Sequence, residues 1–308
     1  MAPNARPSVA AKPAAIAVDK IPAELQLPIL ELMLQARKGD ENDEALKRRG
    51  IGHFQMSGSG HEGLAGLGIL LRPQDYLHPH YRDRVLVHAK GLTHERIARL
   101  FLSKSGPGCE GRQMPAHYCA GDLRIGSHSS PIGSKVLHAV GMGQSIKARG
   151  LDEIVVASMG DAGSREGECW EGLAQAAQDK VPVLLVIADN HYGISTRTEG
   201  KTFWTLDGSI AAVTAAQKAA GCNADGSFLS MPVYFANGSN VVDVYQKSAQ
   251  ALKYIRAKHG AAILIVRTER FGSHSSSDDQ RQYRSADELA HILENDPIPA
   301  YADALIAA

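Results

Sequence analysis

Two short polar segments, each directly after an apolar run, carry residue types that bind a metal ion and phosphate. Gly160-Asp161-Ala162-Gly163 follows the run 154–159, and Asp189-Asn190-His191-Tyr192 follows the run 183–188. A glycine at a strand end lets phosphate approach the backbone, and the next helix offers unpaired N–H groups and the positive end of its dipole. Carboxylate, amide and backbone oxygens suit magnesium. The segments predict an oxygen shell for a cation shared with two phosphates.

The elements that must position these segments form a strand, helix, strand unit. The two apolar runs are of strand type, and residues 165–178 between them have a helical pattern. Two buried strands joined through a helix run parallel with a right-handed connection. Ligands of open α/β sheets bind beyond the carboxyl ends of the strands, so both polar segments are expected at one edge.

A second strand-helix-strand pattern follows later in the chain. A strand is predicted at 232–236, a helix at 241–259 that ends at Gly260, and a strand at 262–268. A polar loop, expected to be mobile, follows at 272–284. The predicted fold class is therefore α/β, a doubly wound, mostly parallel sheet flanked by helices.

The N-terminal part divides into a tail and the start of the body. Residues 1–20 are rich in Ala and Pro and predict a disordered tail, with a transit peptide as the alternative. Residues 21–308 are predicted to form one domain, which begins with one or two helices over 21–50. Glycine is dense over 58–68, which indicates close approach of the backbone to a neighbour or ligand, or tight helix packing alone, and we expect it to serve subunit packing.

The bulk composition excludes several classes of protein. The 308 residues contain 33 Lys plus Arg and 33 Asp plus Glu, so nothing favours a nucleic acid or an anionic membrane as partner. No run approaches the roughly 18 apolar residues of a membrane span. Four cysteines without a C-x-x-C pair indicate reduced thiols and a cytoplasmic location, with the mitochondrial matrix as the weaker alternative. A zinc site from Cys109, His117 and Cys119 fits no common spacing.

A family resemblance becomes specific at the two polar segments. Asp161 and Asn190 lie 29 positions apart, one strand-helix-strand circuit, and this is the spacing of the thiamin diphosphate signature. Residues 160–168 together with 189–196 resemble the alpha subunits of thiamin-diphosphate-dependent 2-oxo acid dehydrogenases. By chance alone, a capping aspartate and a turn asparagine could give the same pattern.

Three further segments narrow the resemblance to the branched-chain, 2-oxoisovalerate type. They are Gly111-Arg112-Gln113-Met114-Pro115-Ala116-His117-Tyr118, Ser129-Ser130-Pro131-Ile132, and Arg270-Phe271-Gly272-Ser273-His274-Ser275-Ser276-Ser277-Asp278-Asp279. The resemblance runs in order from about residue 52 to residue 298. It covers nearly the whole chain after the tail.

The resemblance implies thiamin diphosphate and magnesium as cofactors. Tyr81 and Arg82 match the pair that contacts the diphosphate, and an arginine fork suits phosphate oxygens. Asp161, Asn190 and the backbone carbonyl of Tyr192 match the magnesium ligands.

Five further residues match the surroundings of the cofactor. Gly160, Ala162 and Gly163 match the backbone that lines the diphosphate. Ser130 and Ile132 match residues beside the two rings of the cofactor, where a bulky aliphatic side chain keeps the cofactor bent. Taken alone, Ile132 would be an ordinary core residue.

His274 matches the active-site histidine of the family. It follows a predicted strand end on a loop at the same sheet edge, where its imidazole could orient the oxo acid carboxylate and assist transfer to lipoamide. A lone loop histidine is otherwise usually solvated. Ser275 beside it occupies the place that a kinase modifies in some relatives, and no modification is predicted here.

The family pattern is broken in three places. Ala162 replaces the last glycine of the G-D-G signature, and Asp189 replaces the first asparagine of the later pair. Ala188 stands where branched-chain relatives carry an arginine near the diphosphate. His80 could partly compensate, although a charge-bearing surface histidine is the expected account of it.

The function implied is oxidative decarboxylation of a 2-oxo acid, branched-chain substrates preferred, with transfer of the acyl group to a lipoylated dihydrolipoyl acyltransferase. A separate beta subunit is expected to supply the glutamate that activates the cofactor, in a heterotetramer. A transketolase-like two-carbon transfer subunit is one alternative, because residues 166–171 also resemble a transketolase helix. A non-catalytic assembly subunit of the same fold is the other alternative.

Overall fold

Six strands form one sheet in the order β1-β2-β3-β8-β7-β6. The computed structural model describes residues 16–308 except residue 107. Neighbouring strands run parallel from β1 to β7, and β6 is antiparallel to β7, so the predicted α/β class with a mostly parallel sheet is confirmed. In sequence order the strands are β1 Tyr76–His78, β2 Val155–Gly160, β3 Val183–Asp189, β6 Gly226–Phe228, β7 Met231–Asn237 and β8 Ala262–Arg267.

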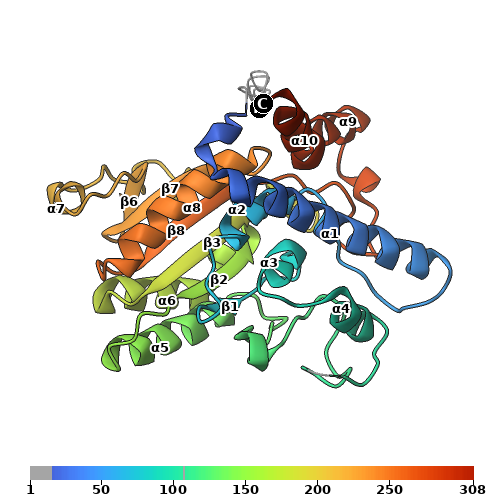
Figure 1. The fold of residues 1–308 in the computed structure, drawn as a ribbon, viewed down its shortest axis with the longest axis horizontal. Helices are drawn as coiled ribbons and strands as arrows, with labels where there is room; N and C mark the ends of the chain where they lie inside the picture. The colour runs from blue at the N-terminus through green and yellow to red at the C-terminus, as the bar shows by residue number, and fades with distance from the viewer. Residues whose placement is uncertain (1–15, 107) are drawn as a thin grey trace, which may run out of the picture.

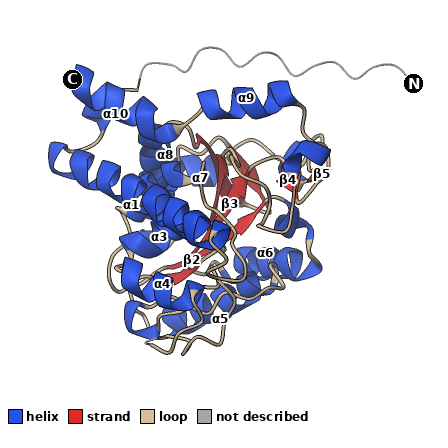
Figure 2. Cartoon of the chain, turned by 90° about the vertical axis from the view of Figure 1, so that its right-hand side faces the viewer, coloured by secondary structure: helices blue, strands red, loops and turns tan. Residues whose placement is uncertain are grey.

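Helices cover both faces of this sheet (Figure 1). Along β2, Val155 belongs to the core under α5 and α6, whereas the next residue, Val156, belongs to the core under α1, α2, α3 and α8. Burial on both faces explains why the strands read as continuous apolar runs. Figure 2 shows the strands between these two helical layers. The bounds are α1 Ala23–Arg48, α2 Ala65–Gly68, α3 Arg84–Ala89, α5 Ser134–Ala148, α6 Gly167–Asp179 and α8 Val241–Arg256.

The remaining elements lie around the sheet edge and the C-terminus. A small antiparallel ribbon, β4 with β5, follows directly after β3. Helices α9 and α10 close the chain, and α10 packs on α1. No helix among the described residues is long and apolar enough to cross a membrane. The bounds are β4 Tyr192–Gly193, β5 Thr196–Arg197, α4 His94–Phe101, α7 Ala215–Ala219, α9 Ala286–Glu294 and α10 Pro297–Ala307.

The predicted tail and first helices differ partly from the structure. Residues 1–15 of the predicted tail 1–20 lie outside the described residues. Its last part, Val18–Lys20, forms a 3-10 turn, and the side chain of Val18 is buried in the core. The predicted one or two helices over 21–50 are a single helix, α1.

The glycine-dense segment packs against this chain itself. A Cβ atom at Gly66 would lie 2.6 Å from the carbonyl oxygen of Val241, and one at Gly63 would clash with the carbonyl oxygen of Gly238. Because neither glycine carries a side chain, the short helix α2 can lie directly on the first turns of α8. Close backbone approach, predicted from the sequence, is thereby accounted for within the chain.

Two local features depart from the sequence-based expectation. The helix predicted to reach residue 259 ends at Arg256, and Lys258 takes a left-handed conformation with φ of 63° before Gly260. Strand β1 was not predicted, because three residues are too short to show a period. β1 pairs with β2 and thereby brings the segment after residue 78 to the same sheet edge as Asp161.

Candidate functional site

A cavity of about 360 Å³ opens at the carboxyl ends of β1, β2 and β3. Because Gly160 pairs with Ala188 across the parallel strands β2 and β3, the two polar segments leave the sheet side by side. The structure brings every residue predicted for the site to the wall of this one cavity: Tyr81, Arg82, Ser130, Ile132, Gly160, Asp161, Ala162, Gly163, Asn190, Tyr192 and His274. Their roles in binding and catalysis stay predictions.

Asp161 is a buried carboxylate at the cavity wall. Its side chain accepts a hydrogen bond from the hydroxyl of Thr198, and only 1% of the residue is exposed. Burial, followed by the neighbouring carboxylate of Asp189, raises the pKa of Asp161 to about 7. Two carboxylates held together away from water are unfavourable without a cation, so this corner fits a divalent metal ion.

Asn190 and Asp189 are held in fixed orientations at the end of β3. The Asn190 amide nitrogen lies 3.4 Å from Nε2 of the buried His61, and its amide oxygen accepts from the backbone N–H of Tyr192 at 3.2 Å. Asp189 accepts hydrogen bonds from the backbone N–H of His191 and from Nε1 of Trp204, both at 3.1 Å. Amide, carboxylate and backbone oxygens thus cluster at one strand end, the donor set that magnesium prefers.

Arg82 is a buried cation that joins three segments. Its guanidinium donates to the carbonyl oxygen of Ser57 and, at 2.7 Å, to that of His274. The same side chain lies 3.2 Å from Nδ1 of His274 and 5.1 Å from the centre of the Tyr81 ring. Only 2% of Arg82 is exposed, and that part faces the cavity, where a guanidinium suits a phosphate.

His274 is a neutral imidazole in this structure. Burial, then the charges of Arg82 and Arg270, lower the pKa of His274 to about 4. An arginine can only donate, so Nδ1 of His274 must accept from Arg82 and the ring proton must be on Nε2. Its backbone N–H donates to Asp278 at 2.7 Å, so the main chain is fixed as well.

The predicted mobile loop is tied by a chain of hydrogen bonds. Arg270 donates to the hydroxyl of Tyr283 at 2.7 Å, and this hydroxyl donates to Asp278, which also accepts from the His274 backbone. Arg284 donates to the carbonyl oxygen of Arg270 at 2.7 Å and closes the base of the loop. The position of His274 therefore depends on polar side chains rather than on sheet pairing.

Ser130 and Ile132 also line the cavity. Nδ1 of His117 lies 3.1 Å from the carbonyl oxygen of Pro115 and must donate to it, so Nε2 accepts from the Ser130 hydroxyl at 2.8 Å. Ile132 packs over Gly163, where a Cβ atom would lie 2.7 Å from the Ile132 side chain. A side chain at position 163 would displace Ile132 from the cavity wall.

Several lining residues were given no role in the sequence analysis. Phe54, Met114, His117 and Glu166 all line the cavity. The signal for three of them was available, because Met114, His117 and Glu166 lie inside the segments that carry the family resemblance. Nothing in the sequence pointed to Phe54, which reaches the cavity only through folding.

His80 corrects one expectation. It is not a charged surface histidine: only 3% of it is exposed, and burial holds its pKa well below the usual range. It lines the cavity as a neutral ring whose centroid lies 3.7 Å from that of the Tyr81 ring, with the two ring planes tilted by 38°. Ala188, which stands at the position of the family's arginine, is buried in the sheet and does not line the cavity. Its methyl group therefore makes no contact of the kind that the arginine makes in the family pattern.

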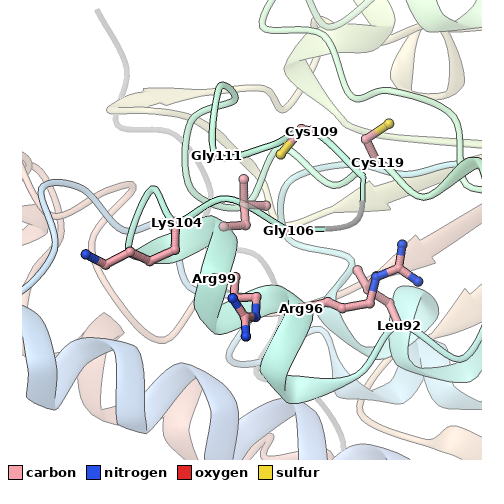
Figure 3. Close-up of a pocket in the computed structure, with 9 residues that line it drawn as sticks. Leu92, Arg96, Arg99, Lys104, Gly106, Cys109, Gly111 and Cys119 are labelled. Atoms are coloured by element: carbon pink, nitrogen blue, oxygen red, sulfur yellow. The ribbon is translucent and has the colours of Figure 1, made fainter.

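The cysteines near the site form no metal centre. Cys109 and Cys119 line a separate cavity of about 20 Å³ beside Arg96 and Arg99 of α4, as Figure 3 shows. His117 lines the large cavity instead. Within the described residues no three His, Cys, Asp or Glu side chains gather to hold a metal ion.

Comparison with known proteins places this geometry in context. Residues 30–308 match the model of the family described as "Dehydrogenase E1 component". The 2-oxoisovalerate dehydrogenase subunit alpha of Bacillus subtilis (strain 168) is 32% identical over 272 residues, which cover 87% of this chain and 78% of that protein.

Two more relatives are named for pyruvate and for 3-methyl-2-oxobutanoate, which is another name for 2-oxoisovalerate. The pyruvate dehydrogenase E1 component subunit alpha of Staphylococcus aureus (strain N315) is 29% identical over 279 residues, 89% of this chain and 68% of that protein. The 3-methyl-2-oxobutanoate dehydrogenase subunit alpha of Mycobacterium tuberculosis (strain ATCC 25618 / H37Rv) is 29% identical over 282 residues, 91% of this chain and 70% of that protein.

Proposed function

Because the chain belongs to the dehydrogenase E1 component family, we propose that it is the alpha subunit of a thiamin-diphosphate-dependent 2-oxo acid dehydrogenase. The observation that carries the proposal is the single cavity at the sheet edge, around which lie all the residues expected to contact the cofactor. The reaction is oxidative decarboxylation of a 2-oxo acid with transfer of the acyl group to a lipoyl group.

The residues at the strand ends would hold the cofactor through a metal ion. Asp161, Asn190 and the backbone carbonyl of Tyr192 would bind magnesium, which neutralises the diphosphate and also relieves the repulsion between Asp161 and Asp189. Arg82, already at the cavity wall, would add a positive charge. Thiamin diphosphate, when bound, supplies the carbon nucleophile and the electron sink for decarboxylation.

His274 would act on the substrate. Its Nε2–H can donate a hydrogen bond to the carboxylate of the oxo acid, because Nδ1 is already engaged by Arg82. The same Nε2 can exchange a proton during transfer to the lipoyl group, and a neutral imidazole is suited to this role. The Ser130 hydroxyl, which donates to His117, keeps its lone pairs as acceptors at the cavity wall.

The partners proposed are a beta subunit and a lipoylated dihydrolipoyl acyltransferase. Each of the three relatives is named as an alpha subunit, which supports a separate beta chain. Branched-chain oxo acids are the preferred substrates of the proposal. Two of the three relatives carry branched-chain names and one is named for pyruvate.

The proposal is tested on the complex purified from the native host with its partners identified by mass spectrometry. Ferricyanide-linked oxidation of 3-methyl-2-oxobutanoate and of pyruvate is measured with and without thiamin diphosphate and magnesium. We expect activity that depends on both cofactors and on a co-purifying beta subunit, and that is greater with the branched substrate. No activity with either oxo acid and no such partner would refute the proposal, and a sugar phosphate assay would then test two-carbon transfer.

A matched pair of histidine variants tests the role of the cavity. His274→Asn should lower turnover by on the order of 100-fold, because it removes a group that acts on the substrate. His259→Asn, at an exposed position after α8, should leave turnover unchanged. Equal activity in the two variants would show that His274 does not take part in the reaction.

A further inference from the structure

Lys135 is a buried cation that the reaction described above does not use. It lies in the first turn of α5, and only 1% of it is exposed. Burial of an ammonium is unfavourable, and a positive charge in the first turn of a helix also opposes the helix dipole. A lysine at this position therefore needs compensating contacts. The role of Lys135 can be inferred from the residues that make those contacts.

The Lys135 ammonium connects two loops of the cavity wall. Its Nζ atom lies 2.9 Å from the carbonyl oxygen of Pro79 and 3.0 Å from Nδ1 of His128. Pro79 immediately precedes the segment 80–82, and His128 lies two residues before Ser130. The ammonium thus joins the loop that presents Tyr81 and Arg82 to the loop that presents Ser130 and Ile132.

The contact geometry depends on a donor at the Lys135 position. Pro79 oxygen and His128 Nδ1 lie 2.9 Å apart, and an ammonium donates to both at once. The His128 ring in turn meets the Tyr81 ring edge-on, with centroids 5.8 Å apart. A change at Lys135 is therefore transmitted to Tyr81 through one aromatic contact.

The surrounding charges balance Lys135 without binding it directly. Asp83 and Glu166 are the carboxylates whose charges favour the ammonium, while burial lowers the pKa of Lys135 to about 7. Asp83 accepts from the backbone N–H of His80 at 2.7 Å, and Glu166 accepts from that of Gly133, the N-cap of α5, at 2.8 Å. Each carboxylate therefore also fixes one of the two loops.

Burial lowers the pKa of three histidines around Lys135, which favours their neutral form. Burial, followed by the charges of His138 and Lys135, lowers the pKa of His78 to about 4, and burial, followed by the charge of Lys135, lowers the pKa of His128 to about 2. His80 is shifted in the same direction. His117 and His138, on the neighbouring segments, complete the set of imidazoles that face this cluster.

We propose that Lys135 is a positioning residue, an internal cation that holds the Tyr81–Arg82 loop and the Ser130–Ile132 loop at the spacing required for the cofactor. The inference rests on the proposed function for the identity of the cofactor, and on the Pro79 and His128 contacts for the positioning. Without the ammonium, the ring proton of His128 can move to Nδ1 and be donated to the Pro79 oxygen, so the connection is weakened rather than abolished.

The test uses the purified complex with Lys135→Met, and with Lys147→Met at an exposed position of the same helix as control. Lys135→Met should raise the thiamin diphosphate concentration for half-saturation about tenfold while kcat at saturation stays within about threefold, because loop spacing affects binding before chemistry. Lys147→Met should change neither. Unchanged half-saturation in a folded Lys135→Met complex would overturn the proposal.

Two further variants separate positioning from loss of folding. The charge-balanced pair Lys135→Met with Asp83→Asn removes the buried charge of Asp83 and should regain thermal stability, while half-saturation stays raised relative to Asp83→Asn alone, which controls for the contact of Asp83 with His80. Lys135→Ala leaves space for a small cation, and added methylammonium should restore half-saturation toward the wild-type value. Recovery of half-saturation along with stability in the charge-balanced pair would show a merely structural role.

A readout without the cofactor distinguishes failure of this inference from failure of the proposed function. In the unliganded complex, amide hydrogen exchange should rise about tenfold over residues 80–83 and 127–133 in Lys135→Met and stay unchanged over β3. If the wild type does not respond to thiamin diphosphate, the proposed function is wrong, and the exchange result still decides whether Lys135 holds the two loops. Equal exchange in wild type and variant would overturn the positioning role.

Discussion

The cavity has two walls that are built in different ways. The strand-end wall consists of residues 160–163 and 189–193, which begin at the last residues of the paired strands β2 and β3. The loop wall consists of residues 80–82, 130–132 and 274, which come from distant parts of the chain. Backbone pairing in the sheet fixes the first wall, whereas a few buried polar side chains hold the second. Side-chain substitutions in the strand-end wall should therefore cost less folding stability than substitutions in the loop wall.

The largest effect on activity is expected at the strand-end wall, where a substitution removes a group that would bind the metal ion. Asp161→Asn removes a proposed magnesium ligand and should lower kcat/KM by on the order of 100-fold or more. The unfolding temperature should stay the same or rise, because the repulsion with Asp189 is removed. Asp152→Asn, at an exposed carboxylate, is the control. Activity within about threefold of wild type would exclude Asp161 as a ligand.

A smaller effect, on cofactor binding and on stability, is expected for Arg82 in the loop wall. Arg82→Met leaves the carbonyl oxygens of Ser57 and His274 without their buried donor, which costs about 1–3 kcal/mol. Urea denaturation measures this loss, and cofactor titration should show half-saturation raised by roughly 10-fold to 50-fold. Arg149→Met on the exposed end of α5 should be neutral in both measurements. Unchanged stability would mean that the loop wall is held by other contacts.

Tyr283→Phe sharpens the comparison within the loop wall. The variant removes one hydroxyl that accepts from Arg270 and donates to Asp278, with an expected cost of about 1 kcal/mol. Since Asp278 holds the His274 backbone, kcat should fall roughly threefold to tenfold. Tyr254→Phe, whose hydroxyl makes only a long contact of 3.4 Å to His259, is the matched control. The same kcat in both variants would show that His274 is positioned without this chain of hydrogen bonds.

The smallest effect is a pH dependence of the free energy of unfolding, caused by Glu269 at the base of the His274 loop. Burial raises the pKa of Glu269 to about 7 from its usual 4.5. The folded protein therefore binds a proton that the unfolded chain releases, so this contribution to stability is full below about pH 4.5 and is lost as the pH rises through 7. The wild type minus Glu269→Gln difference in unfolding free energy should fall by up to about 2 kcal/mol between pH 4.5 and pH 8. A difference that is independent of pH would mean that Glu269 is ionised throughout.

The strand-end wall could be predicted from the sequence, because its information is local. The continuous burial of β2 and β3 and the polar residues at their ends follow from short segments, and the parallel unit brings Asp161 and Asn190 together without reference to the rest of the chain. The loop-wall residues Tyr81, Ser130 and His274 were found only through the family resemblance. β1, which carries Tyr81 to this edge, is too short to leave a period.

The sequence by itself determined the parallel strand-helix-strand unit and the oxygen-bearing residues that lie at the ends of its strands. Tertiary structure alone decided the protonation state and the partners of the groups around them. Only folding buries His80, half-buries His274, lowers the pKa of both rings and places Lys135 beside Pro79 and His128. The physical reason is that desolvation and charge pairing depend on neighbours that are far apart in the chain. A buried parallel strand, by contrast, can be recognised from a short run of adjacent apolar residues.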